Sequence, residues 1–160
     1  MSLMDAPAYD PTRDNRNRNI LIATCVTVFL LIVLTLAGYM LGHGWLFSNL
    51  GYEHRVDTFF SALEAKDYDK AYSIYNGGLP NPDYSLQRFT EDWTTASPVH
   101  TSITSHHVDI SRTDGSGTFG TGIIVAVRVN GTHPVFMYVN RADKTMTWPA
   151  PHELKYEYNP

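Results

Sequence analysis

The sequence predicts an α+β domain that follows a single membrane-spanning helix. The first observation is a long apolar segment without charge near the N-terminus. The second is a change in the spacing of apolar residues, which recur at helical spacing before residue 98 and at every second position after it. We therefore expect two to three helices followed by an antiparallel sheet of about four strands, with the helices covering one face of the sheet.

The charge of the chain argues against several classes of ligand. The 160 residues have a net charge of −4, and the acidic excess lies after residue 42, where nine Lys and Arg residues accompany thirteen Asp and Glu residues. Because no basic cluster is visible along the sequence, we expect neither nucleic acid nor anionic lipid headgroups as ligands. Cys25 is the one cysteine, which excludes an intrachain disulfide and a cysteine-based metal site. No metal and no cofactor are expected.

The apolar segment Ile20 to Leu41 is long enough to cross a membrane. Its 22 residues carry no charge, and as a helix they would span roughly 33 Å, against a hydrocarbon core of about 30 Å. Arg13, Arg16 and Arg18 precede the segment, whereas few basic residues follow it closely. This asymmetry predicts a single-pass protein of the cytoplasmic (inner) membrane, with the N-terminus inside and the C-terminal domain outside.

Three other interpretations of the apolar segment fit less well. A cleaved signal peptide has a shorter apolar core and a site of small residues, which the exit sequence LAGYMLGHG lacks. A lipoprotein would need its cysteine at the end of the segment, whereas Cys25 is near the start. A buried helix of a soluble protein would need more surrounding chain. Gly38 and Gly42 form a G-x-x-x-G step, which predicts a contact between two membrane helices, although glycine is common in such helices anyway.

Changes in composition divide the chain into five predicted segments. They are a disordered cytoplasmic tail over residues 1–19, the transmembrane helix over 20–42, a juxtamembrane linker over 43–51, the extracytoplasmic domain over 52–148 and a C-terminal tail over 149–160. The first segment is rich in Asp, Asn, Arg and Pro and shows no apolar periodicity, which is typical of a disordered tail.

The domain is predicted to begin with two helices that meet at a corner. Both carry an apolar stripe at i, i+3, i+4 and i+7, formed by Val56, Phe59, Phe60 and Leu63 and then by Tyr68, Ala71, Tyr72 and Tyr75. On one continuous helix the second stripe would be rotated by roughly 120° from the first. We therefore expect a break at Lys66 and Asp67, with Asp67 as the N-cap of the second helix. A loop over 76–84 leads to a third short helix that begins after Ser85.

The remaining chain is predicted to form the sheet. Residues 103–110 suit a polar edge strand, residues 123–129 a strand with strong alternation, and residues 146–148 a short last strand. Asn130-Gly131 predicts a two-residue hairpin turn, which would place Val125 opposite Phe136 and Ile123 opposite Tyr138. Pro134 predicts an edge position or a bulge in the strand that follows the turn.

This order of elements resembles that of the NTF2-like superfamily. The resemblance rests on VDTFFSALEAKDYDKAYSIY, on LQRFTEDW and on the sheet that follows, and it covers about residues 52–148. The pattern FF-x-A-L-x-x-x-D-Y-x-K-A-Y is similar to the opening of small membrane-anchored bacterial domains of this superfamily. The resemblance implies a curved sheet wrapped around a helix as a cone, often with a pocket. Some members are isomerases or dehydratases that use a pocket Asp, His or Tyr, whereas others only bind partners or assemble, including a periplasmic domain of type IV secretion systems.

Few residues are candidates for chemistry. His106 and His107 are adjacent on a strand and point to opposite faces, so the pair is not suited to a shared metal. Asp92 beside Trp93 could act as a base if it were buried, although the pair also suits the wet side of a helix. The possible pocket-lining residues are Tyr72, Tyr75, Asp92, Trp93, His107 and Tyr138. No nucleophile motif and no phosphate-binding glycine loop is present in the sequence, so no catalytic residue is assigned.

Two functions remain open on this basis. The first is a non-enzymatic binding or assembly module of the cell envelope, tethered to the membrane through Ile20 to Leu41, with a protein partner or a second copy of itself. The second is a small-ligand pocket protein or an isomerase-like or dehydratase-like enzyme, which would use Tyr75, Asp92 or His107. A pocket inside the domain would favour the second function, and an interior filled by Phe59, Phe60, Trp93 and Tyr138 would favour the first.

Overall fold

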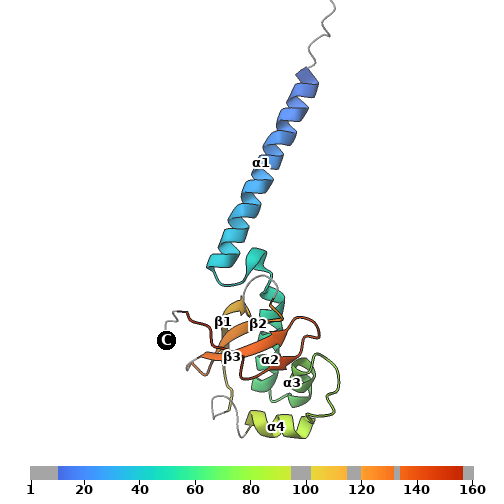
Figure 1. Ribbon diagram of the computed structural model, residues 1–160, viewed down its shortest axis with the longest axis vertical. Coiled ribbons are helices and arrows are strands. Elements are labelled where there is room, and N and C mark those ends of the chain that lie inside the picture. Colours follow the sequence, from blue (N-terminus) through green and yellow to red (C-terminus); the bar gives the residue numbers. More distant parts are fainter. Residues whose placement is uncertain (1–10, 95–101, 115–119, 132–133, 157–160) are drawn as a thin grey trace, which may run out of the picture.

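The computed structural model describes residues 11–94, 102–114, 120–131 and 134–156. It confirms the α+β class, with a long N-terminal helix standing on a domain of helices and an antiparallel sheet (Figure 1). The elements are α1 (Pro11–Met40), η2 (Trp45–Phe47), α2 (Leu50–Glu64), α3 (Tyr68–Tyr75), α4 (Leu86–Thr94), β1 (His106–Thr113), β2 (Gly122–Val129), β3 (Pro134–Asn140) and β4 (Met146–Thr147).

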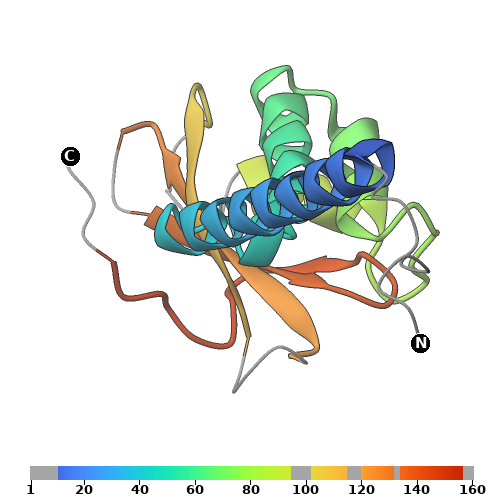
Figure 2. The same ribbon diagram turned by 90° about the horizontal axis from the view of Figure 1, so that it is seen from above.

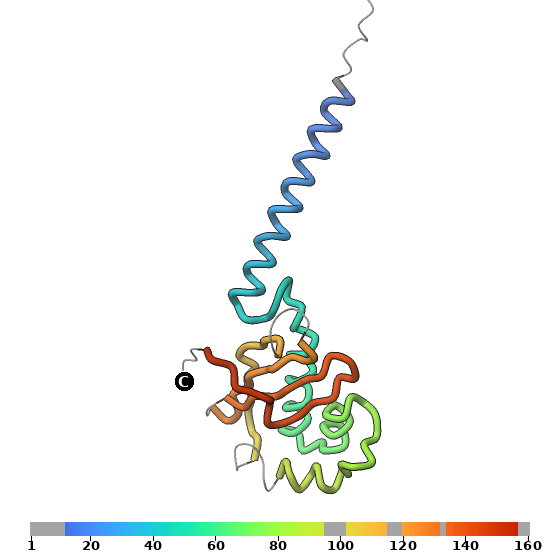
Figure 3. Tube along the Cα trace, viewed as in Figure 1, coloured from blue at the N-terminus to red at the C-terminus, as the bar shows by residue number. Residues whose placement is uncertain are grey.

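Helix α1 projects away from the domain (Figure 3). Its apolar side chains are exposed. It is long and apolar enough to cross a membrane, and none of its most apolar window is buried inside the structure. Ile20 is 58% and Phe29 65% exposed. The helix begins at Pro11, so residues 11–19, for which the sequence predicted a disordered tail, are helical. Proline is favoured at the first helical position, and Asp14 lies in the first turn, where a negative charge is stabilising.

The predicted corner between two helices is confirmed. Helix α2 ends at Glu64, and Lys66 adopts a positive φ of 58°, which turns the chain out of the helix. The side chain of Asp67 accepts a hydrogen bond from the backbone N–H of Lys70 at 3.1 Å and thereby caps α3. Ser85 caps α4 in the same way, because its Oγ accepts from the backbone N–H of Arg88 at 3.3 Å.

The sheet has the strand order β1-β2-β3-β4, with every neighbouring pair antiparallel. The predicted edge position of the first strand is confirmed. Pro134 is the first residue of β3, which is a central strand, so the proline indicates neither an edge strand nor a bulge. Proline is tolerated there because β4 is short and pairs only with Tyr138 and Val139.

The predicted register of the β2–β3 hairpin is wrong by one residue. Arg128 lies opposite Pro134 and Val125 opposite Met137, whereas a two-residue turn would place Val125 opposite Phe136. Asn130 and Gly131 do have positive φ angles of 54° and 69°. Burial explains the register. Residues opposite each other on two strands lie on the same face of the sheet, so buried Val125 pairs with buried Met137. A register shifted by one residue would place half-buried Phe136 opposite Val125 instead.

A bulge in β1 changes which of its side chains face the helices. Val108 lies opposite Val127, whereas Ile110 lies opposite Ala126, so Asp109 is the extra residue in the strand. After the bulge the alternation is inverted. Ser111 therefore points toward α2, where strict alternation would have placed Ile110.

Helices α2 and α3 lie on one face of the sheet, α4 packs against α3, and a C-terminal segment crosses the other face (Figures 1 and 2). The segment starts beside β3, where the backbone N–H of Ala150 donates to the carbonyl of Phe136 at 3.1 Å. It reaches β1, where the hydroxyl of Tyr156 donates to Asp109 at 2.7 Å. Arg128 contacts the same carboxylate at 2.8 Å. The outer face of the sheet is thus partly covered by the chain itself.

Candidate functional site

Three of the predicted pocket residues meet in an aromatic cluster at the end of the domain far from α1. Tyr72, Tyr75 and Trp93 pack with Phe59 and Phe89, and the ring centroids of Phe59 and Trp93 are 5.0 Å apart. Phe59 and Phe89 are fully buried. Edge-to-face contacts of this kind stabilise a core in addition to burying its area. The cluster therefore fills the space in which a pocket was sought.

Beside the cluster there is a hollow of about 50 Å³, lined by Leu63, Lys66, Tyr68, Trp93, Thr94, Ser102 and Ile103. A hollow of this volume accommodates no more than a few water molecules. It does not have the size of a substrate pocket, which typically measures about 300–1,000 Å³.

Asp92 lies at the surface next to the aromatic cluster and is exposed. Its Oδ2 accepts a hydrogen bond from the hydroxyl of Tyr84 at 2.9 Å. Burial, together with this bond to a carboxylate, raises the pKa of Tyr84. Burial also raises the pKa of Tyr75. Asp92 is thus the acceptor for a neutral phenol, and it lacks the burial that would suit it to act as a base.

His107 and Tyr138 do not join the other predicted pocket residues, because both lie on the opposite face of the sheet. The side chain of His107 is 69% exposed and approaches Asp109 at 3.6 Å. The Tyr138 hydroxyl is 2.9 Å from the hydroxyl of Thr121, and its ring covers Gly122, where a Cβ atom would clash with it. Tyr138 therefore has no part in filling the interior.

His106 lies on the helix-facing side of β1, between two carboxylates of α2. Its Nδ1 is 2.6 Å from Glu64 and its Nε2 is 3.0 Å from Asp57, and the ring stacks on Phe60. Each ring nitrogen of His106 is thus within hydrogen-bonding distance of a carboxylate of α2. This arrangement fastens the sheet to α2.

A second histidine–carboxylate pair lies at the other end of α2, where α1 joins the domain. Glu53 is 6% exposed, and its two oxygens lie 2.8 and 3.0 Å from Nδ1 of His43. The hydroxyl of Ser111 donates to the same carboxylate at 2.5 Å, and the backbone N–H of Ser111 donates to the carbonyl of Gly42 at 2.9 Å. This network joins the exit of α1 to α2 and to β1.

The network does not have the arrangement of a hydrolytic triad. In such a triad the histidine lies between the serine and the acid, so that it can take the proton of the serine. Here Glu53 lies between Ser111 and His43, and Ser111 is fully buried. The geometry therefore assigns these residues to holding the junction together.

The glycines of the G-x-x-x-G step make contacts within the chain. A Cβ atom on Gly38 would lie 2.6 Å from the carbonyl oxygen of Gly44, and Gly42 has a φ of +86° and packs against Ile110. Both glycines are buried. The chain therefore needs them to fold the exit of α1 against the domain, and the predicted contact between two helices stays a prediction.

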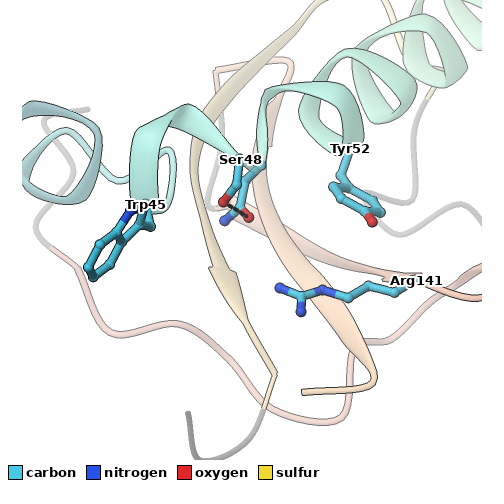
Figure 4. A pocket seen from close by; sticks show the side chains of 5 residues that line it. Trp45, Ser48, Tyr52 and Arg141 are labelled. Carbon is cyan, nitrogen blue, oxygen red and sulfur yellow. Dashed lines mark hydrogen bonds between the residues drawn. The ribbon is translucent and has the colours of Figure 1, made fainter. Parts of the chain in front are cut away.

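A larger hollow, of about 610 Å³, lies at the same junction. We call it the junction pocket; it is lined by Trp45, Ser48, Asn49, Tyr52 and Arg141. Figure 4 shows Arg141 crossing the hollow with its guanidinium group directed toward Ser48 and Trp45. Asn49 is the N-cap residue of α2 and lines the pocket, so this helix, with the positive end of its dipole, begins beside it. Leu46 and Phe47, beside the pocket, have positive φ angles of 49° and 58°, which are unfavourable for bulky residues.

The basic side of the junction pocket is built by the turn between β3 and β4. Arg55 of α2 donates to the carbonyl of Lys144 at 3.1 Å and to that of Ile74 at 2.7 Å, which attaches the turn to the helices. The ammonium of Lys144 donates to the hydroxyl of Tyr52 at 3.0 Å and lies over its ring. Arg141 contacts the hydroxyl of Thr113 at 3.2 Å. The described lining of the pocket thus includes one guanidinium and the hydroxyl groups of Ser48 and Tyr52, with the ammonium of Lys144 next to it on Tyr52. Charged and hydroxyl donors of this kind suit an anion.

The sequence analysis did not predict this pocket. Trp45 was recognisable only as an aromatic residue near the membrane boundary, and Tyr52 and Lys144 are separated by 92 positions.

Within the described parts of the chain, no group of three His, Cys, Asp or Glu side chains is placed to hold a metal ion. Comparisons of the chain with protein families, curated proteins and solved structures find no match.

Proposed function

We propose that the protein is a single-pass membrane protein whose domain acts as a binding or assembly module at the membrane surface. The observation that carries this proposal is helix α1, whose apolar side chains are exposed over its most apolar stretch and are not buried by any residue that the structure describes. Such a surface is stable in a lipid bilayer and unfavourable in water.

The orientation we propose follows the charges that flank α1. Arg13, Arg16 and Arg18 place the N-terminus in the cytoplasm, and the domain then lies outside the cytoplasmic membrane of a bacterium. Tyr39 and Trp45 are 67% and 66% exposed near the domain end of the helix, where aromatic side chains favour the membrane–water interface.

A binding or assembly role is supported by the way the domain is built. The aromatic cluster fills the described interior, and the His43–Glu53–Ser111 network fastens the domain to the end of α1. The chain thereby presents its outer surfaces at a defined height above the membrane. Membership of the NTF2-like superfamily stays part of the proposal, on the resemblance of the sequence over about residues 52–148.

The test of the proposed topology uses a chain in which Cys25 is replaced by Ala. Leu79→Cys places a thiol on the domain, where Leu79 is 69% exposed, and Asn15→Cys places one at the start of α1. We expect a membrane-impermeant maleimide to label Leu79→Cys on intact cells and Asn15→Cys only after lysis, with both chains retained in carbonate-washed membranes. Loss of the chain from those membranes, or the reverse labelling, would overturn the proposal.

The assembly role is tested by cross-linking the chain in its membrane through its lysines. Cross-links from the domain to a second copy or to one recurring partner protein are expected. A domain that cross-links to no protein at all would contradict an assembly role while leaving the topology intact.

A further inference from the structure

We propose that the junction pocket binds the phosphodiester of an anionic phospholipid headgroup from the membrane that holds α1. This inference rests on the proposed function, because it needs α1 to lie in a bilayer. It assigns a ligand to the concave surface formed by Trp45, Ser48, Asn49, Tyr52 and Arg141. The inference departs from the expectation, drawn from the lack of a basic cluster along the sequence, that anionic lipid headgroups are not ligands.

The position of the pocket is the first argument. α1 ends at Met40, and the close approach of Gly38 to the backbone of Gly44 and Phe47 folds the following turn back against the last turn of the helix. Trp45 is therefore held at the height of the helix end. With α1 spanning the bilayer, this height is the headgroup region.

The apolar rim of the pocket is the second argument. Trp45, Leu46 and Leu50 are 66%, 45% and 48% exposed and continue the exposed apolar surface of α1. A continuous patch of exposed large apolar side chains marks a surface that meets lipid or another apolar partner. An aromatic and aliphatic rim beside a single guanidinium matches the two parts of a phospholipid, whose chains are apolar and whose headgroup is polar.

The charge of the pocket is the third argument. Arg141 is the charged residue among those that line it, and Lys144 lies against the ring of Tyr52. The nearby carboxylate of Asp143 accepts from the backbone N–H and the hydroxyl of Thr145 at 2.9 and 2.7 Å, in a local turn. Glu53 points to His43 and Ser111. A guanidinium, a nearby ammonium and the N-terminus of α2 together favour a phosphate group.

The pocket is also pre-organised for this ligand. Arg55 fastens the basic turn to the helices through two backbone carbonyls, and Tyr52 holds Lys144. The side chains that would contact the phosphate are thus ordered before it binds, which reduces the entropy lost on binding.

The test measures lipid binding to the full chain in detergent by native mass spectrometry, with phosphatidylglycerol as the probe. We expect saturable binding that Arg141→Gln weakens about tenfold or more, because it removes a charge-assisted contact. Trp45→Ala is a second variant, chosen because Trp45 is exposed, and it is also expected to weaken binding, because it removes the aromatic part of the rim. Arg88→Gln, which makes the same change of charge on α4, is the matched control and is expected to bind like the unaltered chain.

Three outcomes would overturn the inference. They are an absence of saturable binding, equal binding by Arg141→Gln and Arg88→Gln, and displacement of the lipid by an equal concentration of inorganic phosphate, which would identify a soluble anion as the ligand. Equal thermal unfolding midpoints for all variants show that they are folded. If the maleimide experiment fails, the proposed membrane anchor is contradicted. If labelling is as expected but lipid binding fails, only the proposed ligand of the junction pocket is contradicted.

Discussion

The two ends of helix α2 are held in different ways. The end far from α1 carries Phe59 and Phe60, which are buried in the aromatic cluster, and His106 there has two carboxylates as partners. The end near α1 carries Glu53, a buried carboxylate that a histidine and a serine satisfy. Each end joins the helix to β1, through His106 at one and Ser111 at the other.

The two ends of α2 therefore have different roles: one mainly stabilises the domain, and the other sets the orientation of the domain relative to α1. Apolar burial is non-directional, so the aromatic cluster stabilises the domain without fixing any single contact. Hydrogen bonds to a buried carboxylate have defined geometry, so the junction network sets how the domain is attached to α1. The larger hollow, the junction pocket, also lies at the end near α1.

The largest expected effect comes from the aromatic end. Phe59→Ala should lower the free energy of unfolding by about 3–5 kcal/mol, because it leaves a cavity among Phe60, Tyr75, Phe89 and Trp93. Urea denaturation of the full chain in detergent, followed by tryptophan fluorescence, measures this loss. Leu79→Ala is the control, since Leu79 is 69% exposed and its truncation should change stability by less than about 0.5 kcal/mol. Similar values for the two variants would show that the cluster is not the main source of stability.

A smaller effect is expected at the junction. Glu53→Gln should cost about 1–3 kcal/mol, because it weakens the contacts of a buried carboxylate with His43 and Ser111. Glu64→Gln should cost less, since the Glu64 side chain is 29% exposed and His106 retains Asp57. The same denaturation experiment ranks the two variants. Only Glu53→Gln should also speed proteolysis between residues 42 and 49. If both variants lose the same stability and are cleaved at the same rate, the proposed difference between the two ends of α2 is wrong.

The smallest effect concerns alkaline pH at the aromatic end. Burial raises the pKa of Tyr75 and of Tyr84 in the folded state above the usual value of about 10. The folded chain then keeps protons that the unfolded chain has lost, so stability is full below about pH 10 and falls as the pH rises above it.

Urea midpoints at about pH 9 and pH 11 measure this slope. Asp92→Asn should make the slope shallower, because its carboxylate contributes to the raised pKa of Tyr84 through their hydrogen bond. A slope that is unchanged by Asp92→Asn and by Tyr84→Phe would assign the alkaline loss of stability to other groups.

Much of the fold could be predicted from local sequence patterns. The period of the apolar residues identified both helices at the corner, and Asp67 and Ser85 were recognisable as caps because capping depends on neighbours three residues away. The β2–β3 register could not be predicted from Asn130-Gly131 alone. It depended on which residues of β3 are buried, and that is decided by packing against the helices.

The candidate site depended almost wholly on tertiary structure. The chain has no basic cluster along its sequence, yet the fold places Arg55, Arg141 and Lys144 at one end of the domain. The bulge at Asp109 turns Ser111 toward Glu53, which strict alternation did not predict.

The apolar helix, the α+β class and the corner at Asp67 could be predicted from the residue pattern alone, because each arises from interactions between residues close together in the chain. The filled interior, the junction network and the junction pocket become visible only in the folded chain. Each of these joins segments up to 92 positions apart, such as Tyr52 and Lys144. Their contacts form only after the sheet has packed on α2, so no local pattern of residue types predicts them.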